Sequence, residues 1–207
     1  MIEIDSRYDF PALFKELGKI KTGIELGVSH GDYSKYLLDN YDSWDMLYGV
    51  DEYVEKWAGG NDPRGIRDDK CYARVSELLS PYPHTLMKTT FNEALNHFDD
   101  EFFDFIFIDG IAHEGQENGR TFWEWFPKLR TGGVFAGRAY DFEYPQCMNT
   151  LNTFISHNKL GDTFKVLHET ANRDYVKNWY LIKGKKETWY SKSIAGELKI
   201  FEKPIIK

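Results

Sequence analysis

The sequence predicts an α/β sandwich in which helices cover both faces of one mostly parallel sheet. Short apolar runs alternate with stretches of helical spacing, and two of these runs end in an acidic residue, Glu25 and Asp51. A third run, residues 103–110, is apolar almost throughout, as expected for a strand buried on both faces. A chain of 207 residues suits one domain with a sizeable core, so we expect a single domain over 1–207.

The first predicted elements are a helix and a strand that leads into a glycine-bearing loop. Residues 1–19 contain an amphipathic helix that closes at Gly18. The following strand ends at Glu25, and its loop turns through Gly27 and Gly31, which allow positive φ and bring backbone N–H groups close to a ligand. This pattern predicts a nucleotide-type pocket, although a tight strand-to-helix turn has the same spacing.

The second strand, MLYGVDEY, is closed by Asp51, about 25 residues after Glu25. An ionised carboxylate accepts two parallel hydrogen bonds, which matches the vicinal diol of a ribose. Asp51 is therefore the predicted ribose ligand, and Glu52 can share that role. The alternative for Asp51 is a helix N-cap for the segment that follows.

The third and fourth strands are predicted at 84–90 and 103–110. A helix with Asn92 as its possible cap follows the third strand. The fourth strand stops at Asp109-Gly110, and ligands of open α/β sheets bind at the carboxyl ends of strands. Asp109 is therefore predicted to lie on the ligand side, with capping of the next helix as its alternative.

Later segments complete the predicted sandwich. Residues 68–79 and 146–158 have helical spacing, and a GGNDPRG loop before the first of them could help to cover a ligand. The runs DTFKVLHET and NWYLIKGKK predict a hairpin. Residues 187–207 form a C-terminal extension with no assigned role.

Three aromatic residues share the helix after the fourth strand: Trp123, Trp125 and Phe126. At positions i, i+2 and i+3 they cannot all face one way, so we expect at least one to point outward. An exposed tryptophan could stack on a substrate or contribute to a homodimer contact, and core packing is the alternative that we favour for the pair.

The stretch ELGVSHGDYSKYL resembles the first motif of class I S-adenosylmethionine-dependent methyltransferases, with Ser29 in place of the middle glycine. In that family an acidic residue and spaced glycines face the amino-acid end of the cofactor. The order of an IDG strand end, a histidine, FPKLRTGG and VFAG is similar to a small-molecule O-methyltransferase-like group with the pattern IDGDHSY, PLLKPGG and GHDY. The resemblance covers residues 20–140. It implies a three-layer Rossmann-like fold, a seven-stranded sheet with an antiparallel C-terminal hairpin strand, and S-adenosylmethionine as cofactor.

The resemblance also implies the site residues. His113 would be the general base, since imidazole titrates near neutral pH, and Asp109 would share the catalytic site. A histidine hydrogen-bonded in a loop is the alternative for His113, and a place in the core is the alternative for Phe91. The implied cofactor-binding residues are Glu25, Gly27, Ser29, Gly31, Ser34, Asp51, Glu52, Thr90, Phe91 and Asp109.

Two departures from the family pattern weaken a metal site. Ala112 stands for the aspartate before the histidine, and Arg138 and Ala139 stand for the histidine and aspartate of GHDY. Members that use a divalent metal take its ligands from such residues, so we predict no metal. The alternative is a Mg²⁺ site made by Asp109, His113 and Asp141. Arg138 could steer an anionic substrate or could be a surface charge.

The amino-acid composition argues against two classes of binding partner, nucleic acids and membranes. A net charge of −7 and a pI near 5.4 argue against nucleic acid as the substrate, because such binding rests on clustered Lys and Arg. No apolar run approaches the ~20 residues that span a bilayer, and the first residues lack the features of a signal peptide. We therefore expect a soluble, cytoplasmic protein without a membrane partner, in which Cys71 and Cys147 are free thiols.

The function predicted from the sequence is S-adenosylmethionine-dependent O-methylation of a small molecule, such as a saccharide or another secondary metabolite. One alternative is a catalytically idle cofactor-binding protein of the same fold, because three family residues are replaced. Another is an NAD or nucleotide-sugar enzyme, which Glu25 disfavours because a carboxylate repels a pyrophosphate.

Overall fold

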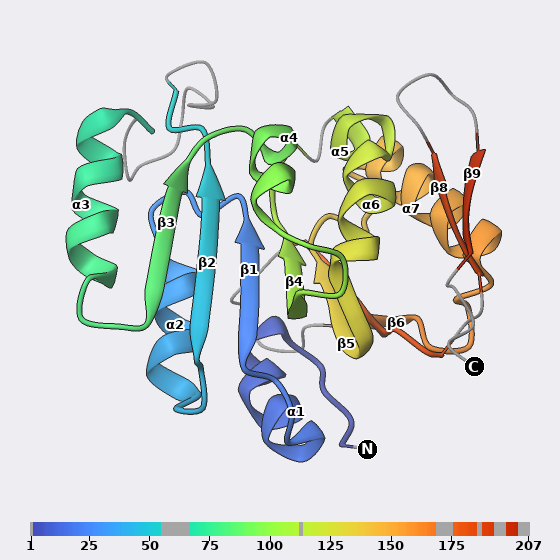
Figure 1. Ribbon diagram of the computed structural model, residues 1–207, viewed down its shortest axis with the longest axis horizontal. Helices are drawn as coiled ribbons and strands as arrows, with labels where there is room; N and C mark the ends of the chain where they lie inside the picture. Colours follow the sequence, from blue (N-terminus) through green and yellow to red (C-terminus); the bar gives the residue numbers. More distant parts are fainter. Residues whose placement is uncertain are drawn as a thin grey trace.

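The computed structural model describes residues 2–54, 67–111, 114–168, 176–185, 188–192 and 198–202. Seven strands form one sheet in the order β3-β2-β1-β4-β5-β7-β6 (Figure 1). The first five strands of the chain run parallel to one another, and β7 is antiparallel to both β5 and β6. The predicted seven-stranded, mostly parallel sheet with antiparallel C-terminal strands is confirmed.

The strands of this sheet are β1 Thr22–Leu26, β2 Met46–Asp51, β3 His84–Lys88, β4 Phe103–Ile108, β5 Leu129–Gly137, β6 Lys165–Leu167 and β7 Asn178–Ile182. The helices are η1 Arg7–Asp9, α1 Phe10–Leu17, α2 Asp32–Asn40, α3 Asp69–Leu79, α4 Phe91–Ala94, η3 Leu95–His97, α5 Gly115–Asn118, α6 Arg120–Trp125, η5 Phe126–Lys128 and α7 Pro145–Asn158. A separate antiparallel pair, β8 Thr188–Lys192 and β9 Leu198–Glu202, lies within the predicted C-terminal extension.

Two apolar cores lie on opposite faces of the sheet. Helices α1, α2 and α3 pack on one face, where the rings of Phe14 and Phe105 are 4.8 Å apart. Helices α4, α6 and α7 pack on the other face. The three-layer α/β architecture follows, because each face of a sheet with apolar residues on both sides needs a helical cover.

The prediction of an outward-pointing aromatic residue on α6 is wrong. Trp123, Trp125 and Phe126 are 3%, 0% and 1% exposed. Helices α6 and α7 pack side by side on the sheet, so α6 meets apolar partners on two sides: Trp123 contacts Phe154 of α7 at 5.0 Å between ring centroids, and Trp125 contacts Phe103 of β4 at 6.3 Å. The argument for a homodimer contact through an exposed tryptophan is therefore lost.

The predicted cap of α4 is also wrong. Thr90 begins the helix, because its Oγ1 accepts the N–H of Glu93 at 3.2 Å while the Glu93 carboxylate accepts the N–H of Thr90 at 3.2 Å. This reciprocal capping box satisfies two backbone donors at once. Asn92, the predicted cap, lies inside the helix.

Other expectations concern the cysteines and the membrane. Cys71 and Cys147 are buried free thiols. Within the described ranges, no helix combines the length and the hydropathy that crossing a bilayer requires.

Candidate functional site

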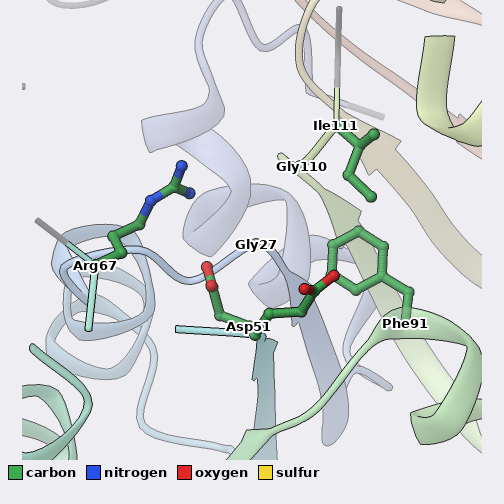
Figure 2. Close-up of a pocket in the computed structure, with 7 residues that line it drawn as sticks. Gly27, Asp51, Arg67, Phe91, Gly110 and Ile111 are labelled. Atoms are coloured by element: carbon green, nitrogen blue, oxygen red, sulfur yellow. The ribbon is translucent and has the colours of Figure 1, made fainter. Parts of the chain in front are cut away.

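A cleft opens at the carboxyl edge of the sheet, beside the ends of β1, β2 and β4 and the start of α4. Figure 2 shows Asp51 and Arg67 on one side of it and Phe91 and Ile111 on the other. Carboxyl ends of adjacent parallel strands meet at one edge, so residues distant in sequence converge there. The lining residues are Gly27, Asp51, Glu52, Arg67, Phe91, Gly110 and Ile111.

The loop after β1 has the conformation that its glycines were expected to allow. Gly27 has φ +99° and Gly31 has φ +83°, and Ser29, where the family has a glycine, has φ +52°. A Cβ atom at Gly27 would lie 2.5 Å from the carbonyl oxygen of Asp109. Only glycine fits there, and the loop passes directly over the end of β4.

Asp51 is the last residue of β2 and is 5% exposed. One carboxylate oxygen accepts the N–H of Ser29 at 2.9 Å, and the other accepts the N–H of Tyr53 at 3.1 Å. A carboxylate has about four acceptor positions, so each oxygen can still accept from a ligand. The two backbone N–H groups therefore hold the carboxylate in a fixed orientation at the cleft.

Glu25 lies under the cleft rather than on its wall. It is 1% exposed, is hydrogen-bonded to Ser34, and is not among the lining residues. Burial raises its pKa to about 8, nearby Asp109 and Asp51 add to the rise, and Ser34 and Arg7 oppose it. The carboxyl is mostly protonated near neutral pH, whereas the sequence interpretation assumes an ionised group. Its contact with a cofactor stays a prediction.

Asp109, directly after β4, is held by two arginines. Its carboxylate is 3.2 Å from Nη1 of Arg7 and 3.7 Å from Nη1 of Arg138. Arg138 follows β5 and is an ion-pair partner, which neither sequence interpretation of that residue included. Arg7 was missed as well, since it precedes Asp109 by 102 residues and no local pattern joins them.

Phe91 lies in the core at 8% exposed and also lines the cleft, and its contact with a cofactor stays a prediction. A Cβ atom at Gly110 would lie 2.7 Å from the Phe91 ring, so this glycine lets the ring close one wall. Thr90 uses its side chain as the helix cap. Of the predicted cofactor-binding residues, the cleft brings together Gly27, Asp51, Glu52 and Phe91. The other six are not among its lining residues: Glu25, Ser29, Gly31, Ser34, Thr90 and Asp109.

Arg67 is a lining residue that the sequence did not indicate. It lies at the end of the segment predicted to cover the ligand, of which residues 55–66 are outside the described residues. His113 and Ala112 are also outside the described residues, so the general base and the alternative Mg²⁺ site stay predictions. Within the described part of the chain, no group of three His, Cys, Asp or Glu side chains could hold a metal ion.

A glycine loop after β1, a fixed carboxylate at the end of β2 and an aromatic wall after β3 are the features expected at the ligand edge of a nucleoside-binding α/β fold. The model of a methyltransferase-domain family matches residues 24–137, more than half of the chain. The chain belongs to this methyltransferase family. No curated protein matches it in sequence.

Solved structures share the fold at low sequence identity. An O-methyltransferase from Bacillus cereus in complex with S-adenosylhomocysteine (SAH) has a TM-score of 0.61 and 15% identity, over 85% of this chain and 80% of that chain. A proposed O-methyltransferase from Klebsiella pneumoniae has a TM-score of 0.61 and 15% identity, over 86% and 80%. An rRNA methylase from Streptococcus thermophilus has a TM-score of 0.58 and 17% identity, over 89% and 99%. At these identities the likeness concerns the fold.

Proposed function

We propose that the protein transfers a methyl group from S-adenosylmethionine to an oxygen atom of a small molecule, such as a saccharide or another secondary metabolite. The observation that carries the proposal is the Asp51 carboxylate, which two backbone N–H groups fix at the cleft. Its remaining acceptor positions fit the two hydroxyls of a ribose. The likeness to O-methyltransferase structures supports oxygen as the accepting atom.

The residues of the cleft suit the parts of this cofactor. Asp51 and Glu52 would bind the ribose, Phe91 and Ile111 would contact the base, and the loop at Gly27 would contact the amino-acid part. When bound, S-adenosylmethionine supplies an electrophilic methyl group on a sulfonium sulfur.

The chain must place the acceptor hydroxyl in line with that methyl group and remove the hydroxyl proton as the oxygen–carbon bond forms. Correct placement can contribute about 7–11 kcal/mol to lowering the barrier. A positioned base adds roughly two to four decades in rate. We propose His113 as this base, with Asp109 sharing the catalytic site, because Asp109 directly follows β4 at the ligand edge and His113 is four residues further along the sequence.

A small acceptor fits the charge of the protein better than RNA does. The net charge of −7 gives no general attraction to a phosphate backbone. The second candidate function is cofactor binding without transfer, which the replacement of three family residues by Ala112, Arg138 and Ala139 favours.

Calorimetric titration with SAH tests the cofactor assignment. The wild type should bind SAH and should not bind NAD⁺. Asp51→Ala should weaken SAH binding about 100-fold, or ~2.7 kcal/mol, because the charged acceptor for the ribose is removed. Asp45→Ala is the matched control, since Asp45 is an exposed acid beside the start of the same strand. Equal SAH affinity in wild type and Asp51→Ala would contradict the proposal.

Transfer to acceptors separates the two candidate functions. A panel of hydroxylated sugars and phenols, incubated with S-adenosylmethionine labelled at its methyl group, should give a labelled product with the wild type. The product should fall by about two decades or more in His113→Ala. Tight SAH binding without turnover on any member would favour the cofactor-binding protein.

A further inference from the structure

The two residues that hold the Asp51 carboxylate share an unfavourable backbone conformation. Ser29 has φ +52° and Tyr53 has φ +49°, so both lie in the left-handed region although neither is a glycine. This region is disfavoured for a bulky side chain, because its Cβ atom approaches the following carbonyl oxygen. A residue keeps such a conformation only where the surrounding structure stabilises it. The contacts of Ser29 and Tyr53 therefore decide how firmly Asp51 is held.

The side chain of Tyr53 is buried away from the cleft. The residue is 2% exposed, belongs to the apolar core on the face that α1, α2 and α3 cover, and is not among the lining residues. Its ring lies 5.4 Å from that of Tyr72 in α3, in an edge-to-face contact that stabilises aromatic pairs. The backbone N–H of the same residue donates to Asp51 at 3.1 Å. The buried ring thus anchors the residue whose N–H holds the carboxylate.

Helix α3 also contacts the second residue that holds Asp51. The carbonyl oxygen of Ser29 accepts the thiol of Cys71 at 3.9 Å, and Cys71 directly precedes Tyr72 in the first turn of α3. The Asp68 carboxylate caps this turn, because it accepts the N–H of Cys71 at 2.8 Å. One capped helical turn therefore contacts both residues whose N–H groups bind Asp51.

We propose that Tyr53 is a positioning residue for the ribose subsite, and that its packing on α3 sets the orientation of the Asp51 carboxylate. Tyr53 acts through its backbone N–H, in a turn where an aspartate side chain accepts the N–H two residues further along. A carboxylate already fixed in place loses less conformational entropy when it accepts two hydroxyl groups. This inference rests on the proposed function, because it requires that Asp51 binds the ribose of the cofactor.

A double-mutant cycle, measured by calorimetry with SAH, tests the positioning role. Tyr53→Ala should weaken SAH binding about tenfold, because the N–H that orients Asp51 is no longer anchored. In the Asp51→Ala background the same change should have almost no further effect, since no carboxylate remains to be oriented. Additive losses in the double variant, or an unchanged SAH affinity in Tyr53→Ala, would overturn the proposal.

Tyr53→Phe separates the ring from its hydroxyl. Among the described residues, the buried hydroxyl of Tyr53 has no hydrogen-bond partner, so the ring alone provides the packing on α3. Tyr53→Phe should therefore bind SAH as the wild type does. A loss as large as that of Tyr53→Ala would show that the hydroxyl, and not the packing, supports the site, and would overturn the proposal.

Tyr41→Ala is the matched control for the loss of a buried tyrosine. Tyr41 is 4% exposed in the same apolar core, and its hydroxyl donates to the carbonyl oxygen of Ile20, before the start of β1. This variant should keep the wild-type SAH affinity. A loss equal to that of Tyr53→Ala would make the effect one of core packing in general and would overturn the proposal.

Circular dichroism establishes that each variant is folded before titration. If Tyr53→Ala does not fold, Tyr53→Leu takes its place in the cycle, with an expected loss of about threefold and the same lack of additivity with Asp51→Ala. Failure of the wild type to bind SAH, or equal SAH affinity in wild type and Asp51→Ala, would instead contradict the proposed function itself.

Discussion

The two edges of the sheet use the same pair of residue types differently. At the amino edge, Asp104 in β4 pairs with Arg130 in β5 and accepts the N–H groups of Lys21 and Thr22 at 2.6 and 2.8 Å. At the carboxyl edge, five residues further along, Asp109 pairs with Arg138 and with Arg7.

The difference shows that residues at one end of the strands stabilise the fold, whereas residues at the other end face the ligand. The Asp104 side chain is 12% exposed, and its partners are backbone amides and one arginine that join β1, β4 and β5. The Asp109 side chain is 23% exposed, has two cations and adjoins the cleft. The charged residues at the amino edge join three strands of the sheet, and those at the carboxyl edge lie beside the cleft, where a ligand can contact them.

The largest expected effect is on stability at the amino edge. Asp104→Ala should lower the free energy of unfolding by about 3 kcal/mol, because Arg130 and two backbone N–H groups lose their acceptor. Chemical denaturation measures the loss, and calorimetry of the folded variant should give an unchanged SAH affinity. A weakened SAH affinity would contradict the conclusion that the amino edge contributes to stability and not to cofactor binding.

The raised pKa of Glu25, at the carboxyl edge, predicts that the stability of the protein depends on pH. Its pKa is about 8 in the folded protein against an ordinary value of 4.5, so the folded state retains a proton that the unfolded chain releases. This contribution to stability is complete below pH 4.5 and is lost as the pH rises toward 8. Glu25→Gln cannot ionise. Its stability relative to wild type should rise by about 2 to 3 kcal/mol between about pH 5.5 and 7.5.

Urea denaturation of both proteins at the two pH values measures this double difference, in which the titration of other groups cancels. The same relative stability at both pH values would mean that Glu25 is ionised in the folded protein, as the sequence alone suggested.

Two glycines, one at each edge, give a second comparison, in which the expected effects on stability are smaller. Gly27 at the carboxyl edge and Gly132 at the amino edge have φ +99° and φ +82°. A Cβ atom at Gly132 meets only an Arg130 side-chain atom at 3.6 Å, whereas one at Gly27 meets the backbone of Asp109 at 2.5 Å. Gly132→Ala should cost about 1 kcal/mol of stability. Gly27→Ala should cost about 2 kcal/mol or more and should also weaken SAH binding. Equal costs with unchanged binding would contradict a close-packed loop over β4.

Much of the carboxyl edge was predictable because its signals are local. Asp51 closes an apolar run and Gly27 follows another, so strand ends and chain order sufficed to bring both to one edge. The helix at 69–79 was predicted within one residue, since Asp68 is a good N-cap and accepts the N–H of Cys71.

The rest depends on contacts between distant segments. The burial of Trp123, Trp125 and Phe126 follows from the position of α7 over α6, which the spacing within one helix does not specify. Arg7 reaches Asp109 only because η1 packs beside the end of β4. The protonation of Glu25 likewise arises from complete burial in the folded chain, which a motif of spaced glycines does not reveal.

Hydrogen–deuterium exchange with and without SAH tests most directly the claim that the carboxyl edge holds the cofactor. SAH should slow exchange at the N–H groups of Ser29 and Tyr53, which bind Asp51, and should leave those of Lys21 and Thr22, which bind Asp104, unchanged. Protection at the amino edge, or none beside Asp51, would contradict the account.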